Sequence, residues 1–343
     1  MTGAMTRKRP TQADVARAAG VSQTLVSLVL NDNALVAVSD ATRERVQAAI
    51  ADLGYVADGA ARSLRTGKSL LVASLIPDIT NPFYPAFERG IQDIADDRGY
   101  DLVAYNTDGL RAKELRALRA VQRARVDGII ATPFQLQAAD FAPLVAGSVP
   151  IVVFGELTSE PETPVFDSIF VDDHAAAGEL VAYLIDRGYW PLGMLAGPGG
   201  VMRREGRVRA YRRLLAERGL PQVELLARGP DPTEAGGYVA MRTLLAGRPL
   251  PRAVFASNDQ MALGALVAIR EAGLRVPDDI ALVGFDDITV ARLASPPLTT
   301  VAQFPERLGR RAAEMLFERL AGTVTGEGRR VEMPYELIVR DSS

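Results

Sequence analysis

The first candidate for a binding function is a carboxylate at the end of a strand-like run. Asp286 directly follows the apolar run 280–285, and Asp287 comes next. At the carboxyl end of a parallel strand a carboxylate faces the cleft where such sheets bind ligands, and it accepts hydrogen bonds from sugar hydroxyls. Capping of a following helix is the alternative role for both aspartates. The pair therefore marks a candidate site for a hydroxylated small molecule.

Groups suited to catalysis or metal binding are scarce in the sequence. The chain has no cysteine, which excludes disulfides, thiolate metal sites and cysteine nucleophiles, and His174 is its single histidine. The run VDDHAAAGEL places His174 at the start of a helix rather than as a general base. The run AGPGG lacks the lysine of a phosphate-binding loop and the spacing of a dinucleotide fingerprint. We therefore predict no catalytic residue, no metal, no cofactor and no enzymatic activity.

Charge is unevenly distributed along the chain. The net charge is -3, but residues 1–68 carry nine Lys or Arg against six Asp or Glu, a net of +3, which leaves -6 for the remainder. A basic segment before an acidic one is expected where only the first meets phosphate. No secretory signal follows the basic triplet 7–9, and apolar runs such as 70–77 fall short of the roughly 20 residues that span a bilayer. These features favour a cytoplasmic protein without a membrane segment.

The elements that carry the basic segment are predicted to be helices. Thr11 is a suitable N-cap for a helix over 12–19, Gly20 supplies a turn, and Ser22 caps a second helix. Ser39 or Asp40 caps a third. Residues predicted to point inward from the second and third helices are Leu25, Val26, Val29, Val46, Ile50 and Leu53. A tight turn between the first two helices indicates a helix-turn-helix unit, whose second helix enters the major groove. A generic helical bundle fits the same pattern.

The rest of the chain is predicted to be an α/β body. From Leu70 onward, strand-length apolar runs alternate with amphipathic helical stretches, and this rhythm restarts after Pro150. Such alternation implies parallel, doubly wound sheets that bind ligands at the carboxyl ends of their strands. Residues 327–343 are predicted to form one final strand. We expect two sheets, each with its own core, and a ligand site in the cleft between them.

Several runs, taken in order, resemble the LacI/GalR repressor family. They include DVARAAGVSQTLVSLVLND, VSDATRERVQAAIADLGYVADGAARSLRTGKS, VASLIPDITNPFYPAFERGIQ, VFASNDQMALGAL, VGFDD and PPLTTVAQ, and the resemblance extends over about residues 11 to 340. It implies a homodimeric, sequence-specific regulator of transcription, a repressor of a metabolic operon, in the bacterial cytoplasm at the nucleoid. Its expected partners are a pseudo-palindromic double-stranded operator and a small-molecule effector that controls it allosterically.

The resemblance also implies a role in DNA contact for residues of the helix-turn-helix domain, 1–57. Gln23 and Thr24 occupy base-reading positions, because a Gln amide bonds adenine bidentately and Thr offers a hydroxyl and a methyl group. Short polar residues that would position the phosphates are Thr11, Ser22, Ser27 and Asn31. Leu28 stands where many relatives have arginine, so an expected guanine contact is missing.

Residues 58–68 resemble the hinge helix and linker of that family. The resemblance implies that Leu64 inserts between base pairs in the minor groove and kinks the duplex, while Arg62 and Arg65 meet the flanking phosphates. An ordinary alanine-rich linker without a role in DNA binding is the alternative.

For residues 69–343 the resemblance implies a periplasmic-binding-protein-like body. Crossings between two subdomains are expected near 168–172, 300–304 and 323–332, which gives the first subdomain about 69–168 and 302–325 and the second about 169–301 and 326–343. Six implied effector contacts are Asp78, Asn81, Phe83, Arg207, Asn258 and Asp286. A surface ion pair for Arg207, a turn for Asn258 and core packing for Phe83 are the alternatives.

Three departures from the family pattern leave the identity of the effector open. Gly155 stands where sugar-binding relatives often have Asp, Ala210 where Gly is usual, and Pro232 where purine-responsive relatives use an aromatic residue. A sugar or sugar derivative is favoured. The competing function is that of a solute-binding protein for a transporter, against which the helix-turn-helix head argues.

Overall fold

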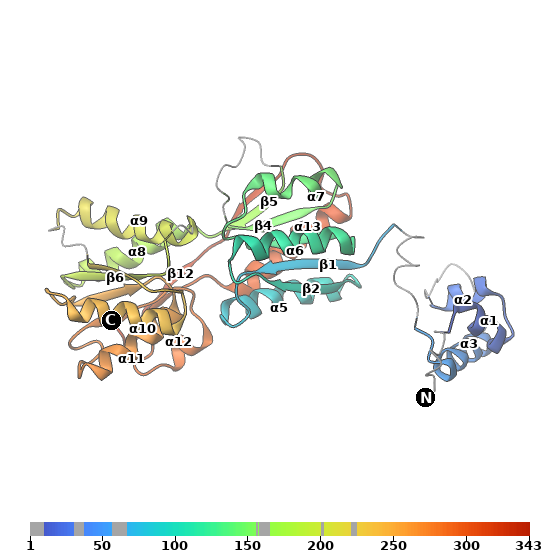
Figure 1. Ribbon diagram of the computed structural model, residues 1–343, viewed down its shortest axis with the longest axis horizontal. Helices are drawn as coiled ribbons and strands as arrows, with labels where there is room; N and C mark the ends of the chain where they lie inside the picture. Colours follow the sequence, from blue (N-terminus) through green and yellow to red (C-terminus); the bar gives the residue numbers. More distant parts are fainter. Residues whose placement is uncertain are drawn as a thin grey trace, which may run out of the picture. The chain divides into compact units, whose positions relative to one another are not determined.

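The computed structural model describes residues 10–30, 38–56, 67–155, 157, 165–199, 202–220 and 225–343, with the backbone alone for 202–204. The chain divides into two compact units, 1–69 and 70–343 (Figure 1). Four residues predicted to contact DNA lie outside the described residues, and their roles stay predictions: Asn31, Arg62, Leu64 and Arg65.

The first unit contains the three predicted helices, α1 (Gln12–Ala19), α2 (Gln23–Leu30) and α3 (Asp40–Leu53). Thr11 caps α1, since its hydroxyl accepts from the Asp14 N–H while the Asp14 carboxylate accepts from the Thr11 N–H. Gly20 ends the helix with φ 66°, a left-handed conformation that glycine adopts without a Cβ clash. The core is formed by Val15, Ala16, Ala19, Val26, Val29, Val46 and Ala49.

Leu53 differs from its predicted place in that core. Its exposed fraction is 36%, whereas Val46 is fully buried and Ile50 packs against the core. Leu53 is the last residue of α3, and the chain turns at Gly54. The end of the helix therefore leaves it beyond the reach of α1 and α2.

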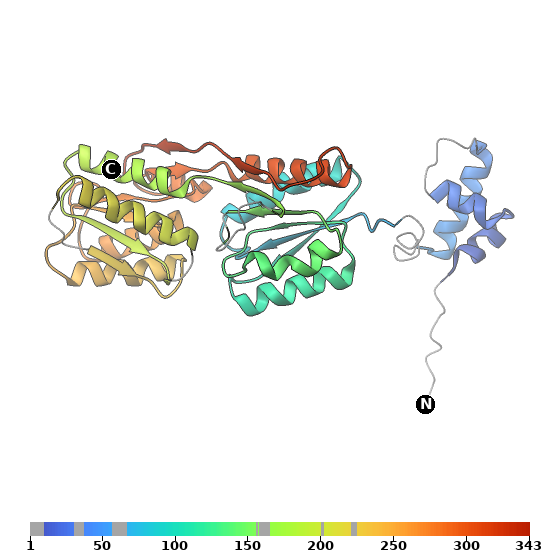
Figure 2. The same cartoon turned by 90° about the horizontal axis from the view of Figure 1, so that it is seen from above.

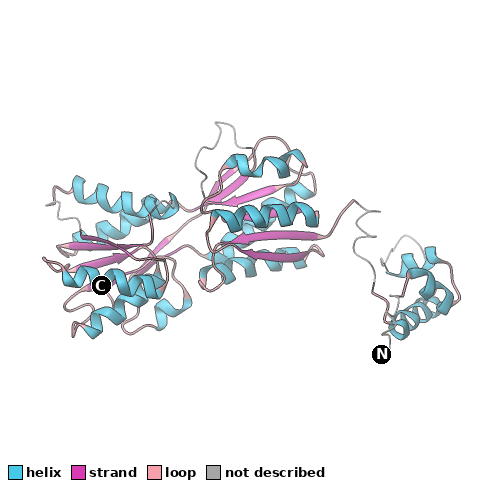
Figure 3. Ribbon diagram, viewed as in Figure 1, coloured by secondary structure: helices cyan, strands magenta, loops and turns pink. Residues whose placement is uncertain are grey.

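The first subdomain of the body is a parallel sheet covered by helices on both faces (Figure 3). Its strands, in spatial order, are β11 (Arg330–Glu332), β5 (Asp167–Phe170), β4 (Ile151–Phe154), β3 (Gly128–Ala131), β1 (Leu71–Ile76) and β2 (Asp101–Asn106). Its helices are α5 (Phe83–Asp96) and α13 (Pro305–Leu320) on one face, with α6 (Arg111–Ala124), η1 (Ala138–Phe141) and α7 (Ala142–Ala146) on the other. The inner strands are apolar throughout because both faces are covered.

The second subdomain repeats this arrangement. Its parallel strands, in spatial order, are β7 (Leu225–Arg228), β6 (Leu192–Ala196), β8 (Ala253–Ala256) and β9 (Ala281–Val283), and an antiparallel pair joins β10 (Thr300–Ala302) to β12 (Glu336–Ile338). Its helices are α8 (Asp173–Asp186) and α9 (Met202–Glu217) on one face, α10 (Glu234–Ala246) and α11 (Asp259–Glu271) on the other, and the short α12 (Thr289–Leu293).

The chain passes between the subdomains three times: between β5 and α8, between β10 and α13, and between β11 and β12 (Figure 2). The first two crossings fall inside the predicted ranges. The third prediction was wrong, because residues 330–332 pair in parallel with β5 of the first subdomain and the chain crosses only at 333–335. The edge of β5 needs a partner for its backbone groups, and β11 supplies it. Residues 327–343 consequently form two short strands rather than one.

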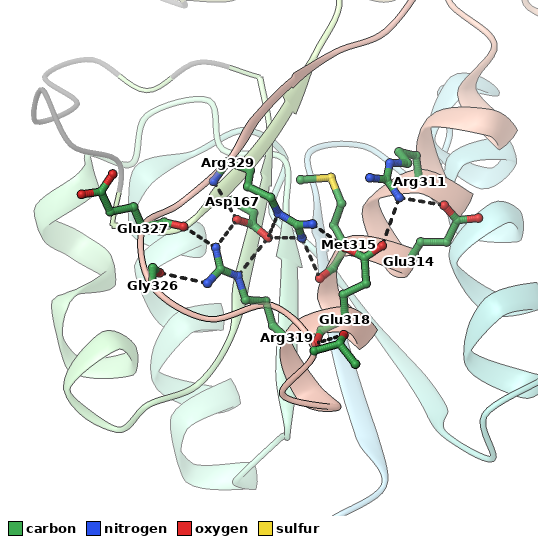
Figure 4. Close-up of polar contacts among 10 residues, drawn as sticks. Asp167, Arg311, Glu314, Met315, Glu318, Arg319, Gly326, Glu327 and Arg329 are labelled. Atoms are coloured by element: carbon green, nitrogen blue, oxygen red, sulfur yellow. Dashed lines mark hydrogen bonds and ion pairs between the residues drawn. The ribbon is translucent and has the colours of Figure 1, made fainter.

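A buried ion cluster holds two of these crossing segments (Figure 4). Asp167 begins β5 with no exposed side-chain surface, and both Arg319 of α13 and Arg329 before β11 donate to its carboxylate at 2.7 Å. Burial alone would raise the pKa of Asp167, but the bonds from the two arginines outweigh it and the pKa is lowered. The cluster therefore ties the strands of the first and third crossings to α13.

A second buried carboxylate, Glu88 of α5, is poorly compensated. The Ser74 hydroxyl of β1 donates to its Oε1, while its Oε2 is buried without a partner among the described residues. Burial raises the pKa of Glu88 to about 7, from an ordinary value of 4.5, and the bond from Ser74 opposes this only in part. The ionised form is therefore disfavoured in the folded body.

We expect Glu88→Gln to stabilise the body at pH 8 and to change little at pH 4.5. The folded chain holds the Glu88 proton more tightly than the unfolded chain, so the stability it contributes is present below pH 4.5 and is lost as the pH rises through 7. The shift corresponds to roughly 3 kcal/mol. Denaturant unfolding at the two pH values measures this, with the exposed Glu217→Gln as control. Equal effects of both substitutions at pH 8 would contradict the prediction.

Candidate functional site

A small cavity lies between the two subdomains of the body. It is lined by Asn81, Phe83, Tyr84, Phe134, Arg207, Asn258, Asp286 and Gln303. Five of the six residues predicted to contact an effector are among them, and Asp78 is not. The volume of the cavity is about 30 Å³, whereas sites for small organic ligands typically measure about 300 to 1,000 Å³. In this conformation the two subdomains are therefore too close for a sugar-sized molecule.

Arg207 of α9 is the cation in the lining of the cavity, and it is buried. Its Nη2 lies 2.9 Å from Asp173 Oδ1 and 3.8 Å from Asp286 Oδ1, and its Nη1 donates to the Ser257 carbonyl. The guanidinium stacks on the Phe285 ring, 3.7 Å from its centroid. Burial alone would lower the pKa of Arg207, but the charges of Asp173 and Asp286 raise it. Arg207 is therefore a buried, fixed cation rather than a member of a surface pair.

Asp286 and Gln303 form a polar wall of the cavity beside Arg207. Gln303 Nε2 donates to Asp286 Oδ1 at 2.6 Å, and Gln303 Oε1 is buried without a partner among the described residues. Asp286 has φ 116°, a backbone conformation rare for residues other than glycine. Such strain persists where the surroundings hold the backbone, as at ligand sites. The wall thus offers a carboxylate, and an amide oxygen that needs a donor.

Asp259 lies fully buried behind this wall. Its Oδ1 accepts from the Thr300 hydroxyl at 2.6 Å, and its Oδ2 accepts from the Ile288 N–H at 2.9 Å. Burial, joined by the charge of Asp286, raises the pKa of Asp259 to about 7. The carboxyl group ties α11 to the loop after β9 and to β10, which places Asp286.

The first subdomain contributes an aromatic wall. Phe83 stacks on Phe154 with ring centroids 5.9 Å apart and meets Tyr84 edge to face at 5.2 Å. Asn81 is buried, and its Oδ1 accepts from the Phe83 N–H. Asp78 instead accepts from the backbone and hydroxyl of Thr80, a local turn that keeps its carboxylate out of the cavity lining.

Asn258 lies in the ligand cavity, as predicted, and also has the structural role that was the alternative. It lines the cavity and is also the N-cap of α11, because its Oδ1 accepts from the Met261 N–H at 2.8 Å. Its Nδ2 donates to the Pro232 carbonyl at 2.9 Å. Both ends of the amide thus bond to the protein, so Asn258 fixes the loop before α10 against α11.

Sequence reasoning assigned no role to three residues of the lining: Tyr84, Phe134 and Gln303. Phe134 follows β3, at the carboxyl end of a parallel strand, which is a position where cleft residues are expected. Gln303 lies in the run LTTVAQ, which served as a family landmark only. No sequence pattern pointed to Tyr84 as a lining residue, except that it follows Phe83 in the chain.

Four of the six predicted DNA contacts that the structure describes are exposed to solvent. Thr11, Ser22, Gln23 and Thr24 are exposed, and Gln23 and Thr24 occupy the first turn of α2. Ser27 and Leu28 are half-buried. Ser22 Oγ accepts from the Leu25 N–H at 3.3 Å, which fixes the start of α2. The first turn of the second helix is thus free to meet base edges, as helix-turn-helix recognition requires.

Comparisons with known proteins agree with both units. The model of bacterial regulatory proteins of the lacI family matches residues 11–58, and that of the periplasmic binding protein-like domain matches 181–343. The HTH-type transcriptional repressor PurR of Photobacterium profundum is 35% identical over 333 residues, 96% of this chain and 97% of that protein. The chain belongs to the lacI family of bacterial regulatory proteins. As a member of the lacI family it is a DNA-binding regulator of transcription and not an enzyme.

Solved structures of lacI-family proteins share the fold. The lac repressor dimer bound to operator and the anti-inducer ONPF has a TM-score of 0.82 at 28% identity, with 98% of this chain and 99% of that chain covered. The complex of the regulator CelR with cellobiose has a TM-score of 0.72 at 34% identity, covering 98% of this chain and 100% of that chain. Within the described part of this chain, no helix combines the length and apolarity needed to cross a membrane, and no metal-binding cluster of three or more side chains occurs.

Proposed function

We propose that the protein is a dimeric repressor whose operator affinity is set by an uncharged polyhydroxy molecule, such as a sugar, bound between the two subdomains. The observation that carries this proposal is the convergence of Arg207, Asp286 and Gln303 on one cavity. A fixed cation, a carboxylate and an amide oxygen without a donor together suit hydroxyl groups, which both donate and accept hydrogen bonds. The cellobiose complex of CelR is consistent with such a ligand.

The charges around Arg207 favour a neutral ligand over a phosphorylated one. Asp173 at 2.9 Å and Asp286 at 3.8 Å already compensate its charge. Among the described lining residues Arg207 is the only cation. A phosphate would have to displace one of these carboxylates or lie beside it, which costs like-charge repulsion in a poorly solvated site.

Effector binding is proposed to work by moving the subdomains. A cavity of about 30 Å³ holds on the order of two water molecules, so a sugar enters only if the subdomains separate. The three crossing segments absorb that movement. The ion cluster at Asp167 anchors the strands that precede two of these crossings to α13, so the movement falls on the residues that follow them. The head would then sense the effector through the hinge at 58–68, with Leu64 as the proposed wedge.

The experiment that tests this function is a binding assay on DNA upstream of the gene. We expect the full-length protein to bind a pseudo-palindromic segment there and a neutral sugar to change that affinity. Gln23→Ala should weaken specific binding by about 1 to 3 kcal/mol, because a bidentate base contact is lost, and leave binding to random DNA unchanged. Fluorescence anisotropy at fixed salt measures both. Equal loss on operator and random DNA would contradict a base-reading role for Gln23.

Exposed apolar residues on one subdomain support the proposed homodimer. Leu293 of α12 is 73% exposed, and Val290, Val239 and Val267 on α12, α10 and α11 are each at least 45% exposed. Exposed apolar side chains of this kind are candidates for burial in a protein interface. A symmetric dimer would present two recognition helices to two half-sites. We infer a cytoplasmic location from the DNA target.

We expect Leu293→Asp to weaken the dimer at least tenfold. Burying a leucine side chain at an interface contributes about 1.5 to 3 kcal/mol, and a charge there adds a desolvation cost. Sedimentation over a range of concentrations measures the dimer dissociation constant. Leu110→Asp, at an exposed leucine before α6, serves as the control. Unchanged association of the Leu293 variant would place the interface elsewhere.

A further inference from the structure

A second and larger cavity opens on the body, with a volume of about 380 Å³. Its lining comes from the start of α5, from the segment around α12 and from the start of α13: Pro82, Phe83, Ala86, Asp287, Ile288, Thr289, Arg292, Phe304, Pro305, Glu306 and Arg307. The volume lies within the usual range for small-molecule sites. Phe83 is the one residue that lines both this cavity and the one around Arg207.

The charged residues of this lining are two carboxylates, Asp287 and Glu306, and two arginines, Arg292 and Arg307. Asp287 is paired with Arg340 at 2.6 Å. Glu306 is exposed and lies 3.7 Å from Arg310, which also pairs with Asp93. Arg292 and Arg307 are exposed and have no acidic partner among the described residues. Two guanidinium groups without an ion-pair partner at one cavity are available to an anion, and their planar forks match phosphate and carboxylate oxygens.

The remaining wall of the cavity is apolar and partly aromatic. Phe83 and Ile288 are buried, and Phe304 is half-buried with φ 52°. The Arg307 guanidinium lies over the Phe304 ring, 4.7 Å from its centroid, which holds the cation at the edge of the apolar surface. A ligand with an anionic head and an apolar or ring-shaped body satisfies both parts of the wall.

We propose that this cavity is a second ligand site for a small organic anion. Its phosphate or carboxylate group binds Arg292 and Arg307, and its body packs on Phe83, Ile288 and Phe304. The site spans both subdomains, because α5 belongs to the first and α12 to the second. Its ligand therefore biases the separation of the subdomains. That regulatory part rests on the proposed function, whereas binding of the anion does not.

Calorimetric titration of the full-length protein with phenyl phosphate tests the site without any DNA or effector. We expect saturable binding that is weakened at least tenfold in Arg292→Gln and in Arg307→Gln at constant ionic strength. Arg119→Gln, an exposed arginine of α6 outside the cavity with the same change in charge, should bind like wild type. Inorganic phosphate should bind more weakly than phenyl phosphate, and benzyl alcohol should not bind.

Three outcomes would overturn the site. The first is that phenyl phosphate does not bind saturably. The second is that wild type and the Arg292→Gln/Arg307→Gln double variant bind phenyl phosphate with equal affinity, and the third is that Arg119→Gln also loses affinity for it. Sedimentation of the same double variant adds a fourth: a weakened dimer with no anion binding in wild type would assign the cavity to a second copy of the chain. Thermal unfolding of each variant checks that the body remains folded.

Discussion

Arg207→Ala is expected to raise the effector concentration needed for a given change in operator affinity by about 10-fold to 100-fold. The reason is that the variant loses a hydrogen bond between the effector and a charged group. It is also expected to lower the free energy of unfolding of the body by about 3 to 5 kcal/mol, because Asp173 and Asp286 lose their buried partner. Operator binding without effector should persist, since the head is a separate compact unit. Anisotropy titrations with effector and denaturant unfolding measure these effects.

Two further variants keep this prediction testable if the alanine variant folds poorly. Arg207→Lys retains the charge but not the planar fork, so stability should largely return while the effector response stays impaired. Arg213→Ala removes an exposed arginine of the same helix, paired with Glu217 at 3.4 Å, and should leave both measurements unchanged. A wild-type effector response in both Arg207 variants would show that the effector binds elsewhere.

Asp167→Ala should destabilise the body by about 3 kcal/mol or more, because it leaves Arg319 and Arg329 near the protein interior without their shared carboxylate. The side chain of Asp167 is fully buried, so solvent does not compensate the loss. The lowered pKa of Asp167 adds a pH dependence. Its contribution is present above the pKa of the unfolded chain and disappears as the pH falls through the lower folded value. Denaturant unfolding between pH 7 and pH 3 follows both.

The matched control for Asp167→Ala is a substitution of Glu314, a nearby carboxylate of α13 that is also drawn in Figure 4. Glu314 accepts from Arg311 at 3.0 Å, but both side chains are at least one-third exposed. Glu314→Ala should therefore cost less than about 1 kcal/mol. Asp167→Asn should flatten the acid limb of the stability profile, because the amide does not titrate. If Asp167→Ala and Glu314→Ala lower the free energy of unfolding by similar amounts, the cluster does not anchor the crossing segments.

The local elements of the fold were predictable because their signals are local. Thr11 caps a helix through a bond to a residue three positions away, and Gly20 ends that helix through its own backbone freedom. The α/β alternation of the body follows from the spacing of apolar runs. The predicted position of the third crossing was wrong because the sequence of residues 327–343 does not indicate which sheet its first strand joins.

The sequence by itself determined that this protein has a three-helix head and a two-sheet body, and it placed Asp286 at the end of a strand. The family resemblance identified the head as a helix-turn-helix unit and added Arg207, which the structure places in the lining of the cavity. Only the tertiary structure decided that Gln303 bonds Asp286 and that Arg329 reaches Asp167 from 162 residues away. The reason is physical: a hydrogen bond between distant segments depends on how the sheets and crossings bring them together, and no local pattern of side chains encodes that distance.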